Sequence, residues 1–277
     1  MTDEARPAAP PVRLTSGLPT GDLLDTVTVT VELPVPAVAL AVGAHPDDIE
    51  FGAGATLARW AAAGCRVHFL VLTDGSKGTW DPDADLAALV AGRAGECRDA
   101  ATRLLGGDVD AAGRVQLLGE TDGELVNGAD QRRAVARAIR SVRPDVLLGH
   151  DPWRRYRLHP DHRAAGFLTL DALVAARDPH FLPEIGLAPH RPDALLLWEA
   201  DLVNHVEPCP VDAAATKVAA LLCHRSQLES TMGLSDDEGD EASGAATFAE
   251  RIAWQLAQHG AVAGLDAGEA FHLIDQL

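Results

Sequence analysis

The stretch that decides the fold reads "PAVALAVGAHPDDIEFGAG" over residues 36–54, where an apolar run passes directly into charged residues and then into glycines. The run from 37 to 44 is typical of a buried strand, and the pattern from 49 onward predicts a helix that ends at Gly64. Pro46 suits the first turn of that helix. A buried strand that leads at once into a helix indicates the start of a βαβ fold.

Strand-like and helix-like patterns alternate as far as about residue 178. Strands are expected at 66–75, 114–119 and 145–150, and helices at 86–105, 129–142 and 160–176. This alternation predicts the α/β class, with a Rossmann-like, mostly parallel sheet and helices on both of its faces.

The pattern loosens beyond residue 178, which indicates a C-terminal elaboration of the sheet. Strands are expected at 193–200 and 203–211, and helices at 212–229 and 247–260. The acidic, glycine- and serine-rich segment 230–246 is expected to be a mobile loop. Residues 1–25 have the composition of a loosely ordered lead-in. Since no linker divides the remainder, we expect one domain at 26–277.

Composition and charge exclude several classes of protein. The chain has 277 residues, 47% of them hydrophobic, which is enough for one sizeable core. No apolar run approaches the ~18 residues of a membrane span, and a net charge of −18 argues against a nucleic-acid partner. The N-terminus lacks the apolar region of a signal peptide, and the four cysteines show no C-x-x-C pairing. We therefore expect a cytoplasmic protein with no membrane partner; whether it forms a homo-oligomer stays open.

Histidines and aspartates follow two of the expected strands. His45, Asp47 and Asp48 come after the first strand, and His159 and His162 come after the strand at 145–150. Ligands of open parallel sheets bind at the carboxyl ends of the strands, so both groups should open onto one edge. Helix capping would need one aspartate and no histidine. One imidazole and one carboxylate from the first group, with one imidazole from the second, match the three protein ligands of catalytic zinc.

"AHPDD" at 44–48 and "HPDH" at 159–162 resemble the motifs of the PIG-L/LmbE-like family of metal-dependent N-acetylglucosaminyl deacetylases. That family includes the deacetylases of mycothiol and bacillithiol biosynthesis. The similarity extends over roughly residues 38–230, with supporting motifs at 72–79, 93–106, 120–125 and 217–227. The resemblance implies hydrolysis of the acetamido group of an N-acetylated amino sugar.

The resemblance also implies a set of metal ligands. They fall on His45, Asp48 and His162, which would hold one Zn²⁺ per chain. Two histidines and one aspartate also accept Fe²⁺ or another divalent ion.

Three further residues match catalytic positions of the family. Asp47 matches the general base that takes a proton from the attacking water. His159 matches the histidine that stabilises the oxyanion and protonates the leaving amine, and Asp161 the carboxylate that orients that histidine.

Substrate contacts in the family match Arg93 and Asp122, which can hydrogen-bond sugar hydroxyls. A helix-surface arginine and a turn aspartate are the alternative interpretation of these two residues. Lys77 is a weaker candidate for a substrate contact, and the motif with His224 and Gln227 implies no defined role. The sequence departs from the family at Ile49, where many members have glutamate.

Other functions agree less well with these residues. The glycines at 52 and 54 suggest a dinucleotide fold, but they come after the helix start and the third glycine is missing. A metal-dependent phosphoesterase would need more carboxylate ligands, usually for two metals. A metal-dependent amidase that acts on a thiol conjugate fits the same site and stays open as the alternative. A binding module that has lost catalysis would show damage at a ligand or at Asp47, and the sequence has none.

Overall fold

The computed structural model describes residues 28–109, 111–234 and 241–277. The expected lead-in at 1–25 and the centre of the acidic segment, 235–240, lie outside these residues. The described part contains an eight-stranded sheet with the order β1-β7-β8-β6-β5-β2-β3-β4. Its strands are β1 (Thr30–Val31), β2 (Val38–Gly43), β3 (Arg66–Thr73), β4 (Val115–Glu120), β5 (Val146–His150), β6 (Ala194–Trp198), β7 (His205–Pro208) and β8 (Gly268–Ile274).

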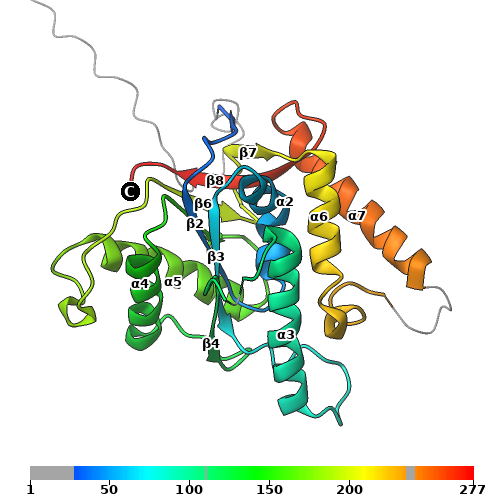
Figure 1. Ribbon diagram of the computed structural model, residues 1–277, viewed down its shortest axis with the longest axis horizontal. Helices are drawn as coiled ribbons and strands as arrows, with labels where there is room; N and C mark the ends of the chain where they lie inside the picture. Colours follow the sequence, from blue (N-terminus) through cyan, green and yellow to red (C-terminus); the bar gives the residue numbers. More distant parts are fainter. Residues whose placement is uncertain (1–27, 110, 235–240) are drawn as a thin grey trace, which may run out of the picture.

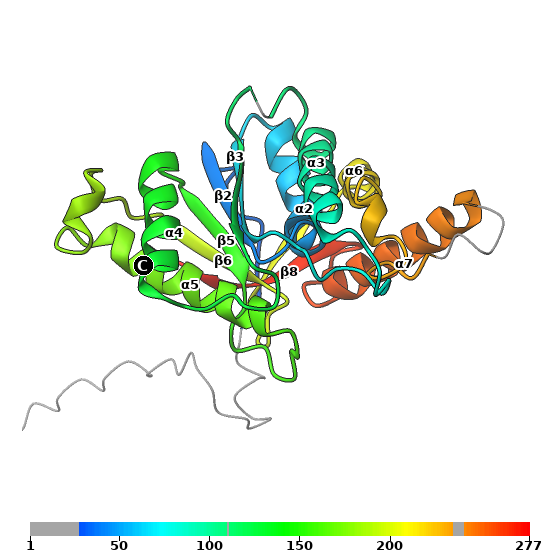
Figure 2. The ribbon, with the colours of Figure 1, turned by 90° about the horizontal axis from the view of Figure 1, so that it is seen from below.

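Helices cover both faces of this sheet, as Figures 1 and 2 show. One face carries α4 and α5, and the other carries α2, α3, α6 and α7. Their bounds are α2 (Asp48–Ala62), α3 (Leu86–Leu105), α4 (Ala129–Val142), α5 (Pro160–Arg177), α6 (Val211–Leu221) and α7 (Glu241–Ala261). Two apolar cores result, one on each side of the sheet. The expected α/β architecture is confirmed.

The strand order reverses at the centre of the sheet, and this reversal places the site. β2 pairs in parallel with β3 on one side and with β5 on the other. The chain leaves β2 into α2 on one face and leaves β5 into α5 on the opposite face. A crevice at the carboxyl ends of the strands forms where connections diverge in this way.

The C-terminal elaboration differs from expectation at three points. The strand β8 was not predicted; it runs antiparallel to both of its neighbours, β6 and β7, whereas the other pairings among the described strands are parallel. α6 ends at Leu221 instead of continuing to 229, because the chain turns there and places buried Gln227 against the carbonyl of Gly78. α7 begins at Glu241, so part of the expected loop 230–246 is helical.

A break inside α2 separates its first turn from the rest of the helix. Ala53 has non-helical backbone angles, with φ −143° and ψ 16°. The amides of Ala55 and Thr56, beyond the break, donate to the buried carboxylate of Glu269 at 3.0 and 2.7 Å. Lys217 neutralises that carboxylate at 2.6 Å. The charged pair therefore caps the second part of α2 from the C-terminal strand, while the first turn carries the predicted site.

Among the described residues, no helix combines the length and the apolar character needed to cross a lipid bilayer.

Candidate metal centre

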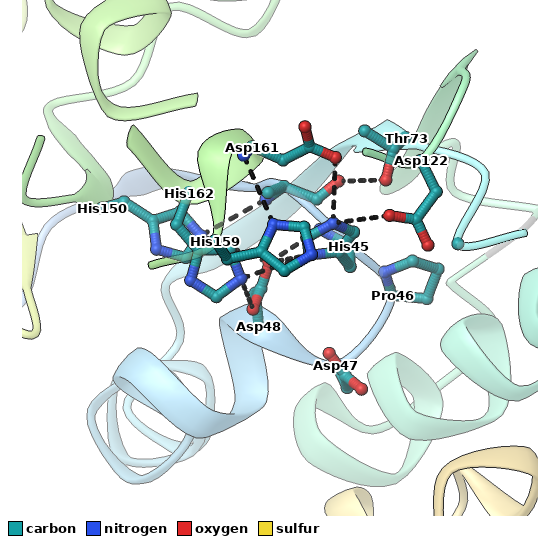
Figure 3. Close-up of polar contacts among 12 residues, drawn as sticks. His45, Pro46, Asp47, Asp48, Thr73, Asp122, His150, His159, Asp161 and His162 are labelled. Atoms are coloured by element: carbon teal, nitrogen blue, oxygen red, sulfur yellow. Dashed lines mark hydrogen bonds and ion pairs between the residues drawn. The ribbon is translucent and has the colours of Figure 1, made fainter. Parts of the chain in front are cut away.

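The two motifs meet at the carboxyl edge of the sheet, between the start of α2 and the start of α5 (Figure 3). The first motif turns sharply out of β2, and Asp48 closes that turn because its Oδ2 accepts the backbone N–H of His45 at 2.7 Å. The second motif begins α5 with Pro160 in the first helical turn, where its missing N–H is not needed. The side chains of His45, Asp48 and His162 are all buried.

The three predicted metal ligands approach one another at ligand-to-ligand distances. His45 Nδ1 lies 3.2 Å from His162 Nε2 and 3.2 Å from Asp48 Oδ2. His162 Nε2 lies 3.3 Å from Asp48 Oδ1. Tetrahedral zinc with bonds of 2.0–2.1 Å requires its ligand atoms to be about 3.3 Å apart. The donor set and its spacing therefore fit a zinc-sized cation.

The opposite nitrogen of His45 faces two carboxylates. Its Nε2 lies 3.2 Å from Asp122 Oδ1 and 3.2 Å from Asp161 Oδ2. Burial opposes a charge on this ring, but the hydrogen bonds to Asp122, Asp161 and Asp48 outweigh it and raise the pKa of His45 to about 12. A cation bound at Nδ1 would replace the proton there, while the two carboxylates keep the other proton on Nε2. Carboxylates orient metal-binding histidines in this way in many sites.

The carboxylate of Asp161 therefore has a different partner from the one expected. The sequence paired its carboxylate with His159, whereas the structure places it against His45 and against the amides of Gly123 and Leu125, at 2.6 and 3.2 Å. The loop after β4 closes over α5 through these bonds. Only the backbone N–H of Asp161 reaches His159, as a donor to Nδ1 at 3.3 Å.

Asp47 lies apart from the histidine cluster in Figure 3. It precedes α2 with φ 115°, a strained angle for a residue other than glycine, and makes no capping hydrogen bond with its side chain. The capping interpretation therefore does not explain it. Burial raises the pKa of Asp47 to about 6 against the opposing charge of Arg93. A buried carboxylate that titrates near neutrality has the properties of a general base.

Arg93 supports Asp47 from the side of α3. Arg93 is 2% exposed, and its guanidinium donates to Asp47 Oδ2 at 3.3 Å and to the carbonyls of Pro46 and Gly75 at 2.7 and 2.9 Å. Asp122, the other residue expected to bind substrate, is also buried and accepts the backbone N–H of Lys77 at 3.0 Å. Both side chains thus hold loops of the site in place.

His159 lies at the exposed mouth of the site. Its ring centroid is 4.5 Å from that of His45 and 5.1 Å from that of His162. Partial burial, followed by the neighbouring histidines, lowers the pKa of His159 below its ordinary value. Because the Asp161 amide donates to Nδ1, the neutral ring carries its proton on Nε2.

Three further residues contact the site: His150 and Glu199, which were not predicted from the sequence, and Arg157, whose arginine-rich loop at 153–157 left open a substrate contact or a surface charge. His150 ends β5 with its Nε2 3.3 Å from Asp48 Oδ2. Glu199 and Arg157 both face the outer nitrogen of His162, with Glu199 Oε2 3.7 Å and Arg157 Nε 2.9 Å from Nδ1, and they pair with each other at 2.8 Å. The position of His150 at a strand end on the site edge was a signal that could have identified it.

The weaker sequence candidates lie around this centre. Lys77 forms an ion pair with Glu124 at 2.9 Å. His224 is buried, with its Nε2 3.4 Å from Glu50 Oε1, and Gln227 donates to the carbonyl of Gly78 at 3.0 Å. Tyr156 is 93% exposed with φ 62°.

Comparison with known proteins gives consistent results. The model of the PIG-L family, described as GlcNAc-PI de-N-acetylase, matches residues 40–173. A diacetylchitobiose deacetylase of Thermococcus kodakarensis is 34% identical over 191 residues, which cover 68% of this chain and 69% of that protein. A 1D-myo-inositol 2-acetamido-2-deoxy-alpha-D-glucopyranoside deacetylase of Saccharopolyspora erythraea is 33% identical over 242 residues, covering 72% and 84%.

A solved structure agrees with these sequence matches. The N,N'-diacetylchitobiose deacetylase of Pyrococcus horikoshii, in complex with its inhibitor MPG, superposes with a TM-score of 0.74 and 26% sequence identity. The match covers 87% of this chain and 84% of that one. The motifs, the fold and the extent of these similarities together establish that this chain belongs to the PIG-L (LmbE-like) family.

Proposed function

We propose that this chain is a zinc-dependent hydrolase that removes the acetyl group from an N-acetylated amino sugar and releases acetate and a free amine. The observation that carries the proposal is the buried cluster of His45, Asp48 and His162 beside Asp47, whose backbone is strained: the two histidine nitrogens lie 3.2 Å apart, and each lies 3.2–3.3 Å from one oxygen of the Asp48 carboxylate. The relatives named above act on acetamido sugars according to their names, which supports the same substrate class.

His45, Asp48 and His162 would hold one cation per chain. When bound, such a cation polarises the acetyl carbonyl and makes a water molecule more acidic. Side chains of this chain would transfer the protons and stabilise the oxyanion.

Asp47 would take the proton of the attacking water, whose oxygen bonds to the acetyl carbon. The C–N bond then breaks. With a pKa of about 6, Asp47 can return the proton to the departing nitrogen. Arg93 keeps this carboxylate in place from the side of α3.

His159 would stabilise the oxyanion. The neutral ring carries a proton on Nε2, because its Nδ1 accepts the amide of Asp161, so Nε2–H is the available donor. This arrangement favours Asp47 over His159 as the source of the amine proton.

A cavity beside the centre supports a carbohydrate substrate. It measures about 130 Å³ and is lined by Lys77, Gly78, Thr79, Trp80, Ser230 and Thr231. The Lys77 amide connects it to the centre through Asp122, which contacts His45. Hydroxyl groups beside an indole that is 76% exposed offer polar and flat apolar contacts, which suit a sugar ring.

We further propose that the enzyme works in the cytoplasm. Cys65, Cys97, Cys209 and Cys223 are all free thiols, and three of them are buried. Free thiols in a chain of this kind are typical of reducing compartments.

A panel of N-acetylated sugars and thiol conjugates tests the function. The zinc-loaded protein should release acetate and free amine in equal amounts from at least one acetamido sugar, and chelation should abolish the release. Turnover of thiol-conjugate amides alone would support the alternative amidase. Turnover of phosphate esters without acetate release would refute the proposal.

A further inference from the structure

His150 and Trp198 form a buried pair behind the candidate metal ligand Asp48. They are the last residues of β5 and β6 and lie opposite each other in the parallel register. His150 is 2% exposed and Trp198 is 1% exposed. Both residues therefore lie at the edge of the sheet where the site forms, but beneath its surface.

The indole of Trp198 determines which nitrogen of His150 carries the proton. Trp198 Nε1 donates to His150 Nδ1 at 3.0 Å. An indole N–H can only donate, so Nδ1 must accept and the proton of the neutral ring sits on Nε2. The Ala44 amide also lies 3.3 Å from Nε2, but a neutral imidazole cannot accept at both nitrogens, and the indole contact is shorter.

A carboxylate also faces Nδ1, but Glu199 Oε2 lies 3.6 Å away, beyond hydrogen-bond distance, whereas the indole N–H lies at 3.0 Å. The indole is therefore the partner that places the ring proton on Nε2.

We infer that His150 is a positioning residue that donates its Nε2–H to Asp48 Oδ2 and turns the other carboxylate oxygen toward the cation. The distance between Nε2 and Oδ2 is 3.3 Å, and the same oxygen accepts the His45 amide at 2.7 Å. Two donors thus occupy Oδ2. Oδ1, 3.3 Å from His162 Nε2, is left for the metal.

This inference rests on the proposed function, and it assigns His150 a role other than that of a metal ligand. Asp48, His150 and His162 lie close enough together to form a cation site of their own. A ring protonated on Nε2 cannot bind a cation through that atom. His150 should therefore tune the affinity for the metal without bonding to it.

Zinc titration against a competing chelator tests the inference with four variants. His150→Leu should weaken zinc binding about 10–100-fold while one zinc still binds per chain. His150→Gln should recover most of the loss, because its amide N–H can reach Oδ2. Trp198→Phe should weaken binding less than His150→Leu. His205→Leu is the matched control: His205 is equally buried but bonds Glu207 at 2.8 Å at the far side of the sheet, so zinc affinity should not change.

Nitrogen-15 NMR of the metal-free protein tests the tautomer independently of activity. His150 should show a protonated Nε2 and an unprotonated Nδ1, and Trp198→Phe should weaken that preference. The inference is overturned by a protonated Nδ1, by unchanged zinc affinity in His150→Leu, or by complete loss of zinc in both His150 variants. If the wild-type chain bound no zinc, the proposed function would fail while the tautomer measurement still decided the role of His150.

Discussion

Replacing Asp47 with asparagine should separate catalysis from stability. Asparagine keeps the size of the side chain and removes its charge and basicity. A general base contributes about 10²–10⁴-fold to a rate, so we expect kcat to fall by that factor, or about 3–5 kcal/mol of transition-state stabilisation. Zinc stoichiometry should stay at one per chain, because the ligands are untouched.

The same substitution should stabilise the metal-free protein at neutral and alkaline pH. Burial raises the pKa of Asp47 from 3.8 to about 6, so the folded state holds this proton more tightly than the unfolded chain. The protonated carboxyl group of Asp47 contributes fully to stability below its pKa in the unfolded chain. This contribution is lost as the pH rises through the pKa of Asp47 in the folded state. The difference corresponds to about 3 kcal/mol. The introduced amide does not ionise, so the Asp47→Asn variant should exceed wild type by up to this amount at about pH 8 and match it at low pH.

Urea unfolding at several pH values, together with acetate release, measures both effects. Asp145→Asn is the matched control, since Asp145 accepts the Val38 amide at 2.9 Å at the opposite edge of the sheet. That variant should retain activity and lose stability. An Asp47→Asn enzyme within about tenfold of wild-type kcat would refute the base assignment. Equal stability of the wild type and the Asp47→Asn variant at every pH would refute the inference that the buried charge of Asp47 destabilises the folded state.

Three other changes probe different parts of the structure. His162→Ala should abolish stoichiometric zinc binding, measured by metal analysis after reconstitution; retained zinc would contradict the ligand assignment. Lys217→Met should lower the free energy of unfolding by about 3–5 kcal/mol, because Glu269 would stay buried without its partner. Adding Glu269→Gln should restore part of that stability. An unchanged urea midpoint in the single variant would contradict the stabilising role of the ion pair. Trp80→Ala should raise KM for a disaccharide or glycoside more than it changes kcat. Equal KM values for the variant and the wild type would show that the indole does not contact the substrate.

The central part of the fold could be predicted because its signals are local. The helix at 86–105 ends at Gly106, and the helix at 129–142 ends before Pro144; both bounds agree with the structure. β8 could not be predicted in the same way. Its pairing with β6 and β7 depends on partners distant in the sequence, and its seven residues alone do not identify a central strand.

The site, like the fold, could be predicted where a local motif defines it but not where it depends on neighbouring elements. The sequence placed His45, Asp48 and His162 at one edge, where the structure brings them together. The partners of those side chains depend on which loops fold over them. The closure of the loop after β4 directs Asp161 to His45 instead of His159, and the register of β5 with β6 places Trp198 against His150.

Anomalous diffraction from crystals of the zinc-loaded protein tests the central claim most directly. We expect one ion per chain, bonded to His45 Nδ1, His162 Nε2 and a carboxylate oxygen of Asp48 at about 2.0–2.2 Å. An ion held instead by His45, Asp122 and Asp161, or zinc-loaded crystals with no ion at this edge of the sheet, would contradict it.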